Sequence, residues 1–217
     1  MRKIAVFGGS GATGHLVIKF ALEREMRIRT LVRNASSSNL PPSAHVIEAP
    51  ILNDNYLDST IKNSEAVIIL FGPRPPYTDI FCDEATKKII LSMQRNKVER
   101  LICQTGAMVG DYPANRTLPF RLMVSIFNRR LPKQAMDREH QEKEVLKSGL
   151  RWTIIKPPRL TDDKEKGKWT AGAHVKVGLL SSISRYDLAR FIIEDVLQNN
   201  RYEGEAVFVR NRRGERP

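Results

Sequence analysis

Three glycines near the start of the chain, Gly8, Gly11 and Gly14, have the three-residue spacing of a turn that can hold a dinucleotide phosphate. In such a turn the first glycine allows the tight bend and the second lets the backbone approach a pyrophosphate. The third lets a helix pack closely on a strand. Free N–H groups at the start of that helix then face the phosphate oxygens. The alternative is a glycine-rich turn that serves packing alone.

The neighbouring residues favour the phosphate-binding interpretation. Residues 4–7 are an unbroken apolar run, which is typical of a strand buried on both faces. Residues 16–22 continue with the apolar spacing of a helix. Strand, glycine turn and helix are the context that this spacing requires.

A second position bears on which nucleotide would bind. Residues 27–32 are expected to form the next strand, and Arg33 follows it where no acid stands. In dinucleotide folds an acid at this point binds the ribose 2′-hydroxyl of NAD, whereas an arginine accommodates the 2′-phosphate of NADP. The sequence therefore predicts NADP(H) as cofactor, the alternative being an exposed arginine at a strand end.

Composition sets limits on the class of protein. The chain has 217 residues, a formal net charge of +12 and two cysteines, Cys82 and Cys103. Their spacing suits neither a metal nor a redox pair, so we expect two buried free thiols and no metal site. There is no apolar run of membrane-spanning length and no leader pattern, so a cytoplasmic protein is expected. The basic residues are spread along the chain, which favours a solvated surface over specific nucleic-acid binding.

The remaining pattern alternates strands with helices. We expect further strands at 45–48, 66–71, 100–104, 151–156, 175–177 and 206–209, and helices at 53–61, 80–96, 133–147 and 185–197, with a loop and helix over 113–131. This alternation predicts an α/β, doubly wound Rossmann-type domain with a mainly parallel sheet. A single domain over 1–217 is expected, with a cofactor-binding half at about 1–110 and a substrate-side half at about 111–217, including a small C-terminal lobe.

Four segments carry a family resemblance. They are Phe7–Gly14, Leu31–Asn34, Ala66–Gly72 and Lys143–Leu160, which follow one another in order over nearly the whole chain. Together they resemble the atypical short-chain dehydrogenases/reductases of the NAD(P)-binding, NmrA-like group. Within that group the resemblance is strongest to the biliverdin IXβ reductase/flavin reductase family.

The resemblance implies a set of cofactor-binding residues in the glycine turn and at the ends of successive strands. They are Gly8, Ser10, Gly11, Ala12, Thr13, Gly14, Arg33, Ile51, Leu52, Phe71, Gly72, Arg74, Thr105, Pro157, Pro158 and Leu160. It also places Arg138 and Arg159 where flavin-reductase relatives carry histidines near the substrate.

Three departures from the short-chain pattern limit the mechanism. The Tyr-x-x-x-Lys pair is missing, because the helix expected at 133–147 has no tyrosine. The serine common after the fifth strand is Gly106, which leaves Thr105 as the adjacent hydroxyl. The acid usual after the third strand is Pro50, so adenine contacts there must be apolar or from the backbone.

The candidate catalytic residues are therefore Thr105, Arg138 and Arg159. An arginine can bind a carboxylate or phosphate and can stabilise negative charge, but it is a poor general acid because it stays protonated. Tyr112 is either near the pocket or an ordinary surface tyrosine, and Glu142 either pairs with a nearby cation or faces solvent. We interpret His15 and His140 as helix-surface residues.

Hydride transfer belongs to the cofactor, and the protein has to position and shield the acceptor. The leading hypothesis is an NADPH-dependent reductase, an oxidoreductase that transfers hydride to a flavin or a biliverdin-like aromatic acceptor. The alternative is a non-catalytic NADP(H)-binding redox sensor or assembly factor, since NmrA-like proteins include sensors without the Tyr–Lys pair. A nucleic-acid-binding protein ranks last. A monomer is expected, because the 133–147 helix is too charged for a helical dimer interface.

Overall fold

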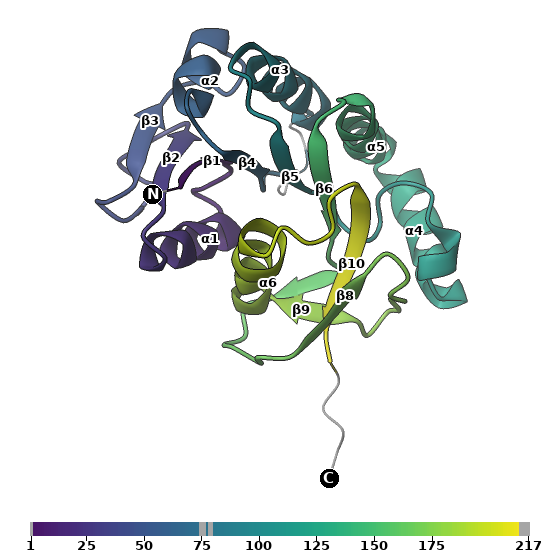
Figure 1. Cartoon of the computed structure of the whole chain (residues 1–217). Coiled ribbons are helices and arrows are strands. Elements are labelled where there is room, and N and C mark those ends of the chain that lie inside the picture. The colour runs from purple at the N-terminus through teal and green to yellow at the C-terminus, as the bar shows by residue number, and fades with distance from the viewer. Residues whose placement is uncertain (1, 74–76, 78–79, 213–217) are drawn as a thin grey trace.

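A computed structural model describes residues 2–73, 77 and 80–212. Its centre is an eight-stranded sheet in the order β3-β2-β1-β4-β5-β6-β10-β8 (Figure 1). Its strands are β1 (Lys3–Phe7), β2 (Arg27–Val32), β3 (His45–Glu48), β4 (Ala66–Ile69), β5 (Arg100–Gln104), β6 (Arg151–Lys156), β8 (Trp169–Gly172) and β10 (Glu205–Asn211). All neighbours are parallel except the edge strand β8, which runs antiparallel to β10.

Helices cover both faces of the sheet (Figure 1). One face carries α1 (Ala12–Glu23) and α6 (Arg185–Phe191), whose helix continues with wider turns as η2 (Ile192–Gln198). The other face carries α2 (Asp54–Ile61), α3 (Cys82–Arg95) and α5 (Pro132–Lys147). This arrangement buries both sides of the central strands, and the side chains of β1 residues Ile4–Phe7 are fully inaccessible. The predicted doubly wound α/β fold in one domain is therefore confirmed.

A smaller layer lies beside the carboxyl end of the sheet. Helix α4 (Leu118–Arg130) follows a short turn, η1 (Pro113–Asn115), and buries Phe120 and Val124 in a third apolar cluster that includes Phe208 of β10. Two three-residue strands, β7 (Arg159–Thr161) and β9 (Ser182–Ser184), pair in parallel next to it. This layer forms one wall of the site described below.

Side-chain caps fix where several helices begin. Asn53 accepts a hydrogen bond from the Asn55 N–H at the start of α2, and Ser184 accepts one from the Asp187 N–H at the start of α6. The cap of α3 comes from another helix, because the buried Asp137 carboxylate on α5 accepts from the Cys82 and Asp83 N–H groups at 3.0 and 2.9 Å.

The structure corrects the predicted elements in the second half of the chain. The strand expected at 175–177 is a single bridge between Arg116 and Val177, and β7, β8 and β9 were not expected. These strands have three or four residues each, so their existence depends on pairing with distant segments and not on a local pattern. The strand expected at 66–71 ends earlier, at Ile69. Both cysteines are buried and free, as predicted.

Candidate functional site

The glycine turn between β1 and α1 is closely packed. Gly8 has φ +86°, and a Cβ there would lie 2.7 Å from the Phe71 backbone nitrogen. A Cβ on Gly14 would meet the Gly8 carbonyl oxygen at 2.2 Å. Gly9, which the sequence analysis did not single out, is equally constrained, because a Cβ would lie 2.4 Å from Thr30 Oγ1. The turn therefore brings β1, α1 and the segment after β4 together as only glycine permits.

The start of α1 suits an anion. Gly11 is the N-cap residue, no side chain of the described residues caps the helix, and its first turn carries no acid. Ser10 and Ala12 are exposed beside it, while Thr13 is buried. The unsatisfied N–H groups and the positive end of the helix are the features that bind a pyrophosphate. These residues fit the phosphates of a dinucleotide.

The other predicted cofactor residues lie along the same edge, because their strands run parallel and end there. Arg33 follows β2 and is exposed, Ile51 and Leu52 follow β3, and half-buried Phe71 and Gly72 follow β4. Thr105 follows β5, and Pro157, Pro158 and Leu160 follow β6. Arg74 lies outside the described residues. Ligands of open α/β sheets bind at this edge.

A buried ion pair lies at the carboxyl ends of β5 and β6. Lys156, the last residue of β6, has a fully buried side chain, and its Nζ lies 2.6 Å from Oε2 of Glu142 on α5. The Thr105 hydroxyl donates to the same oxygen at 2.8 Å, and Lys156 Nζ lies 3.4 Å from Thr105 Oγ1. Of the two alternatives for Glu142, pairing with a cation is confirmed by this contact, and the solvent-facing one is wrong because Glu142 is 2% exposed.

Burial and nearby charge set the proton affinity of this cluster. Burial lowers the pKa of Lys156 to about 8, the Glu142 carboxylate opposes that shift, and the Arg116 and Arg138 charges add to it. A lysine with this pKa can release and recover a proton near neutral pH, where an ordinary lysine cannot. The Thr105–Glu142–Lys156 cluster is therefore suited to proton transfer.

Tyr112 closes the cluster on its other side. Lys156 Nζ lies 4.3 Å from the centre of the Tyr112 ring, and the ring packs edge-on against Phe208. Burial and the Glu142 charge raise the pKa of Tyr112, so its hydroxyl stays protonated. Gly110 leaves the room for this arrangement, because a Cβ there would meet Glu142 Oε1 at 2.6 Å and the Tyr112 ring at 2.8 Å. The surface-tyrosine alternative is wrong for this residue.

Arg138 is a buried connector between loops. Its guanidinium donates to the carbonyl oxygens of Phe71, Gln104 and Thr105 and to the Gln141 side chain. These bonds tie α5 to the segments after β4 and β5, and they occupy the groups that would otherwise contact an acceptor. Arg159 is exposed at the start of β7.

Sequence reasoning passed over Lys156, although one signal was available. A lysine that ends an apolar strand of an α/β sheet, directly before Pro157, stands at the edge where ligands bind. The residues that contact it are Glu142 on α5 and Thr105 and Tyr112 in the segment after β5, so no local sequence pattern links them to Lys156. A charged residue in such a strand should be examined for a buried counter-ion.

A substitution at the glycine turn tests its role. Gly8→Ala should destabilise the fold by roughly 3 kcal/mol and weaken NADPH binding at least about tenfold, since it combines positive φ with a backbone clash. Gly149→Ala is the control, because Gly149 has φ +69° but open space around it, so only the conformational cost of about 1 kcal/mol applies. Urea denaturation measures the loss of stability, and NADPH titration measures the loss of affinity. Equal effects of Gly8→Ala and Gly149→Ala would contradict the role of Gly8 in the nucleotide-binding turn.

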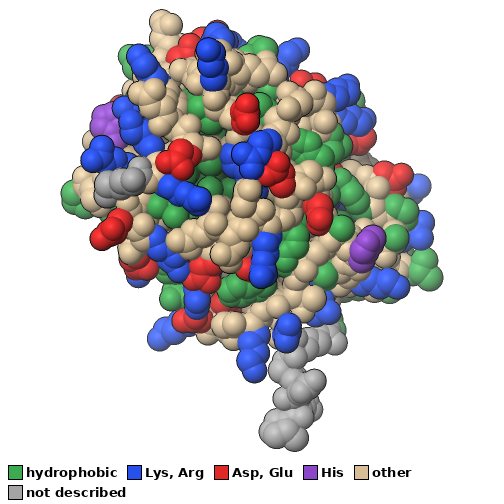
Figure 2. Space-filling view, viewed as in Figure 1, with side chains coloured by type: hydrophobic (Ala, Val, Ile, Leu, Met, Phe, Trp, Pro, Cys, Tyr) green, Lys and Arg blue, Asp and Glu red, His purple; other side chains and the backbone are tan. Residues whose placement is uncertain are grey.

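The rest of the described molecule shows no competing site of a familiar kind. Among the described residues no group of His, Cys, Asp and Glu is placed to hold a metal ion. In the same part of the chain, none of the helices has the length and apolar character that a bilayer crossing requires. Figure 2 shows Lys and Arg side chains interspersed with acidic ones over the face viewed, without a continuous basic stripe.

Comparisons with known proteins agree with this geometry. The NAD(P)H-binding family matches residues 8–199. YwnB, an uncharacterized protein of Bacillus subtilis, is 26% identical over 95% of this chain and 97% of its own length. An uncharacterized chloroplastic protein of Arabidopsis thaliana is 25% identical over 91% of this chain and 72% of its own.

Solved structures share the fold. A short-chain dehydrogenase/reductase from Veillonella parvula, in complex with NADP, has a TM-score of 0.78 at 17% identity, over 96% of this chain and 94% of its own. ChuY of Escherichia coli O157:H7, described as an anaerobillin reductase, has a TM-score of 0.77 at 13% identity, over 99% of this chain and all of its own. With the matched residues beginning in the glycine turn and extending through both halves of the sheet, this chain belongs to the NAD(P)H-binding family of Rossmann-fold proteins.

Proposed function

We propose that the protein is an NADPH-dependent reductase of a flavin or a biliverdin-like aromatic acceptor. The observation that carries this proposal is the buried Thr105–Glu142–Lys156 cluster, which lies at the carboxyl edge of the sheet, where open α/β sheets bind their ligands. Reduction of such an acceptor by hydride requires a proton as well, and this cluster is a proton source. ChuY, which shares the fold, is described as a reductase.

Residues of this chain would hold the cofactor along the carboxyl edge. Ser10, Gly11, Ala12 and Thr13 would surround the pyrophosphate, Ile51 and Leu52 would flank the adenine, and Pro157, Pro158 and Leu160 would border the nicotinamide. A buried oxygen supports this arrangement: no described residue donates a hydrogen bond to Gln104 Oε1, at the end of β5. A ribose hydroxyl or carboxamide N–H could satisfy it.

The protein's part of the reaction is proton delivery and shielding. Bound NADPH supplies the hydride from its nicotinamide ring. The Thr105 hydroxyl gives a proton to the acceptor and takes one from the Lys156 ammonium. Glu142 holds both groups in place, and Lys156 regains its proton through the Thr105 hydroxyl from water that enters the acceptor site after the product leaves. Tyr112 covers Lys156 and contributes to its complete burial. Arg138 acts as a positioning residue because its bonds are already made to loop carbonyls.

Activity assays test the proposal directly. The oxidation of NADPH, and of NADH in parallel, is followed by loss of nicotinamide absorbance with FMN, biliverdin and a quinone as acceptors. Turnover with FMN or biliverdin and a preference for NADPH are expected. Tight NADPH binding without turnover on any acceptor would contradict the proposal and favour a cofactor-binding sensor. Monomeric state, cytoplasmic location and the division into two functional halves stay predictions.

The preference for NADPH should depend on Arg33, which follows β2. Arg33→Ala is expected to lower the ratio of NADPH to NADH affinity by roughly 10- to 100-fold, because a charged hydrogen bond to the 2′-phosphate is lost. Lys19→Ala removes the same charge from the exposed side of α1 and should leave the ratio unchanged. Titration of both nucleotides measures the ratio. An unchanged ratio in Arg33→Ala would show that another group reads the phosphate.

The pH dependence follows from Lys156 as the acid. The group must be protonated to act, and its pKa is lowered to about 8, so kcat/KM is expected to be flat below that pH. Above it kcat/KM should fall about tenfold per pH unit as the ammonium is lost. The same falling limb in Lys156→Met would contradict the assignment, since that variant has no titrating amine at the position.

A further inference from the structure

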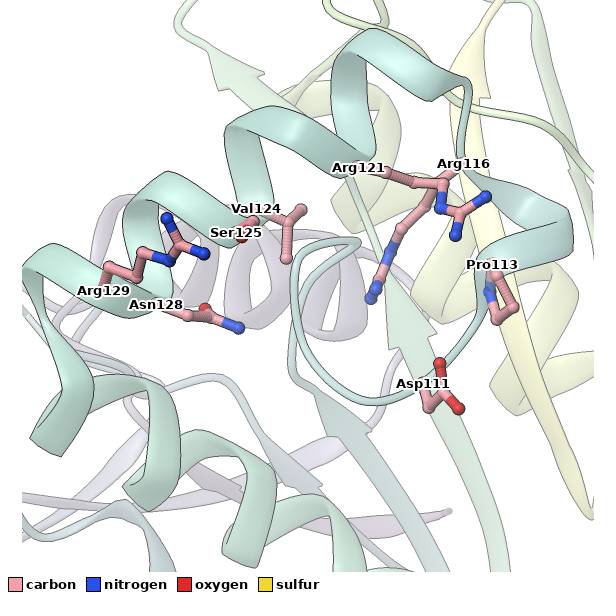
Figure 3. A pocket seen from close by; sticks show the side chains of 8 residues that line it. All are labelled: Asp111, Pro113, Arg116, Arg121, Val124, Ser125, Asn128 and Arg129. Carbon is pink, nitrogen blue, oxygen red and sulfur yellow. The ribbon is translucent and has the colours of Figure 1, made fainter.

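A cavity of about 400 Å³ lies between α4 and the loop that follows β5 (Figure 3). It shares no lining residue with the glycine turn, and its lining residues Asp111 and Pro113 flank Tyr112 of the loop after β5. Its walls are formed by one segment before α4 and by the face of α4 itself. The lining residues are Asp111, Pro113, Arg116, Arg121, Val124, Ser125, Asn128 and Arg129.

The charge in this cavity is unbalanced. Three arginines line it against one acid, Asp111. Arg121 and Arg129 are exposed, and within the described part of the chain neither guanidinium makes a hydrogen bond or ion pair. In Figure 3 the side chains of Arg116 and Arg121 start from neighbouring positions and then diverge, with Arg116 reaching toward the loop after β5. Arg121 and Arg129 therefore leave two exposed positive charges in the lining of one cavity, and a bound anion would neutralise them.

Arg116 fixes the cavity relative to the cluster. Its guanidinium donates to the carbonyl oxygens of Ala107 and Val109 at 2.8 and 2.7 Å, and so braces the loop between Thr105 and Tyr112. Asp111 and Pro113 flank Tyr112, whose ring covers Lys156. A molecule in this cavity is therefore one loop away from the Thr105 hydroxyl.

The remaining lining residues define the kind of molecule that fits. Ser125 and Asn128 offer neutral hydrogen-bonding groups, while Val124 and Pro113 give apolar walls. Guanidinium groups bind carboxylate and phosphate oxygens in paired, charge-assisted hydrogen bonds. An acidic side chain carried on an apolar ring system matches this combination.

We propose that this α4 cavity binds the acidic group, carboxylate or phosphate, of the electron acceptor and so selects acidic aromatic acceptors over neutral ones. Arg121 and Arg129 make the contacts, and Arg116 holds the loop that orients the acceptor toward Thr105. This assignment rests on the proposed reductase function, but anion binding itself can be measured without turnover. It names residues that the family resemblance did not indicate.

The test pairs acceptors that differ only in their acidic group. FMN is compared with riboflavin, and biliverdin with its dimethyl ester, for wild type and for the double variant Arg121→Gln/Arg129→Gln. In the variant, KM and Kd for FMN, for biliverdin or for both should rise roughly 10- to 100-fold, with kcat changed little. Riboflavin and the diester should bind wild type and variant alike. A double variant Lys87→Gln/Lys147→Gln, on the exposed surface of α3 and α5, controls for net charge.

The outcomes separate this inference from the proposed function. A selective loss for FMN alone identifies phosphate as the group bound, and a selective loss for biliverdin alone identifies carboxylate. An equal loss of affinity for the acidic acceptors and their neutral analogues, or no loss of affinity in either pair, would overturn the inference. If no acceptor is turned over, the reductase function fails, while Kd values measured by fluorescence on NADP⁺-loaded protein still decide whether the cavity binds anions.

Discussion

Lys156→Met is expected to destabilise the protein by about 3–5 kcal/mol, because it leaves the Glu142 carboxylate buried without its counter-ion. The double variant Lys156→Met/Glu142→Gln should recover most of that loss. Neither of the two positions then carries a buried charge, and the introduced amide oxygen can still accept from the Thr105 hydroxyl. Urea denaturation of wild type, of Lys156→Met and Glu142→Gln alone and of the double variant gives the coupling free energy between the two positions.

Activity separates the structural role of Lys156 from its chemical role. The double variant should fold and bind NADPH but should not regain turnover, because the proton source is gone. The exposed pair Glu139 and Lys143 on α5 is the matched control, and its coupling should be only about 0.3–0.5 kcal/mol. A coupling of that size for the buried pair, or recovered turnover in the double variant, would contradict the mechanism.

Thr105→Val should lower kcat by roughly 100-fold or more, the contribution of a positioned proton donor. Valine keeps the shape of threonine and removes only the hydroxyl that bonds Glu142 and lies next to Lys156. Thr105→Ser restores the hydroxyl and should stay within a few-fold of wild type, by the same reasoning. Steady-state kinetics with saturating NADPH and direct NADPH titration measure the two effects apart.

A second buried threonine controls for the loss of a buried hydroxyl as such. The Thr60 hydroxyl bonds the Tyr56 carbonyl on α2, away from the cluster, so Thr60→Val should affect stability without affecting kcat. If Thr105→Val and Thr105→Ser lower kcat equally, the hydroxyl is not the donor. If neither lowers it, water supplies the proton and the cluster is structural.

Features encoded by neighbouring residues were predictable from sequence. The glycine turn, the central strands and the caps at Asn53 and Ser184 each depend on residue types a few positions apart. Parallel strands also end at one edge, so the positions of Arg33 and Thr105 at the same edge could be expected. The geometry of the glycines then follows from how tightly β1 and α1 pack.

The proton-transfer cluster could not be predicted in the same way. Lys156, Glu142 and Tyr112 come from a strand, a helix and a loop, and they meet only when α5 packs on the sheet. The charge of α5 also hides its inward face from sequence analysis: polar residues outnumber apolar ones in this helix, yet Arg138 and Glu142 are both buried. Periodicity detects apolar faces and misses an inward face made of paired polar groups.

The polar contacts on the inward face of α5 also determine where this helix lies relative to the sheet and to α3. Asp137 caps α3, Arg138 bonds the loops after β4 and β5, Gln141 bonds Thr86, and Glu142 bonds Lys156. An apolar helix can slide and repack at modest cost, but a slip of one residue here would turn each group by about 100° away from its partner. The four contacts therefore hold α5 in a single position along its axis, and this position fixes where the Glu142 carboxylate meets Thr105 and Lys156.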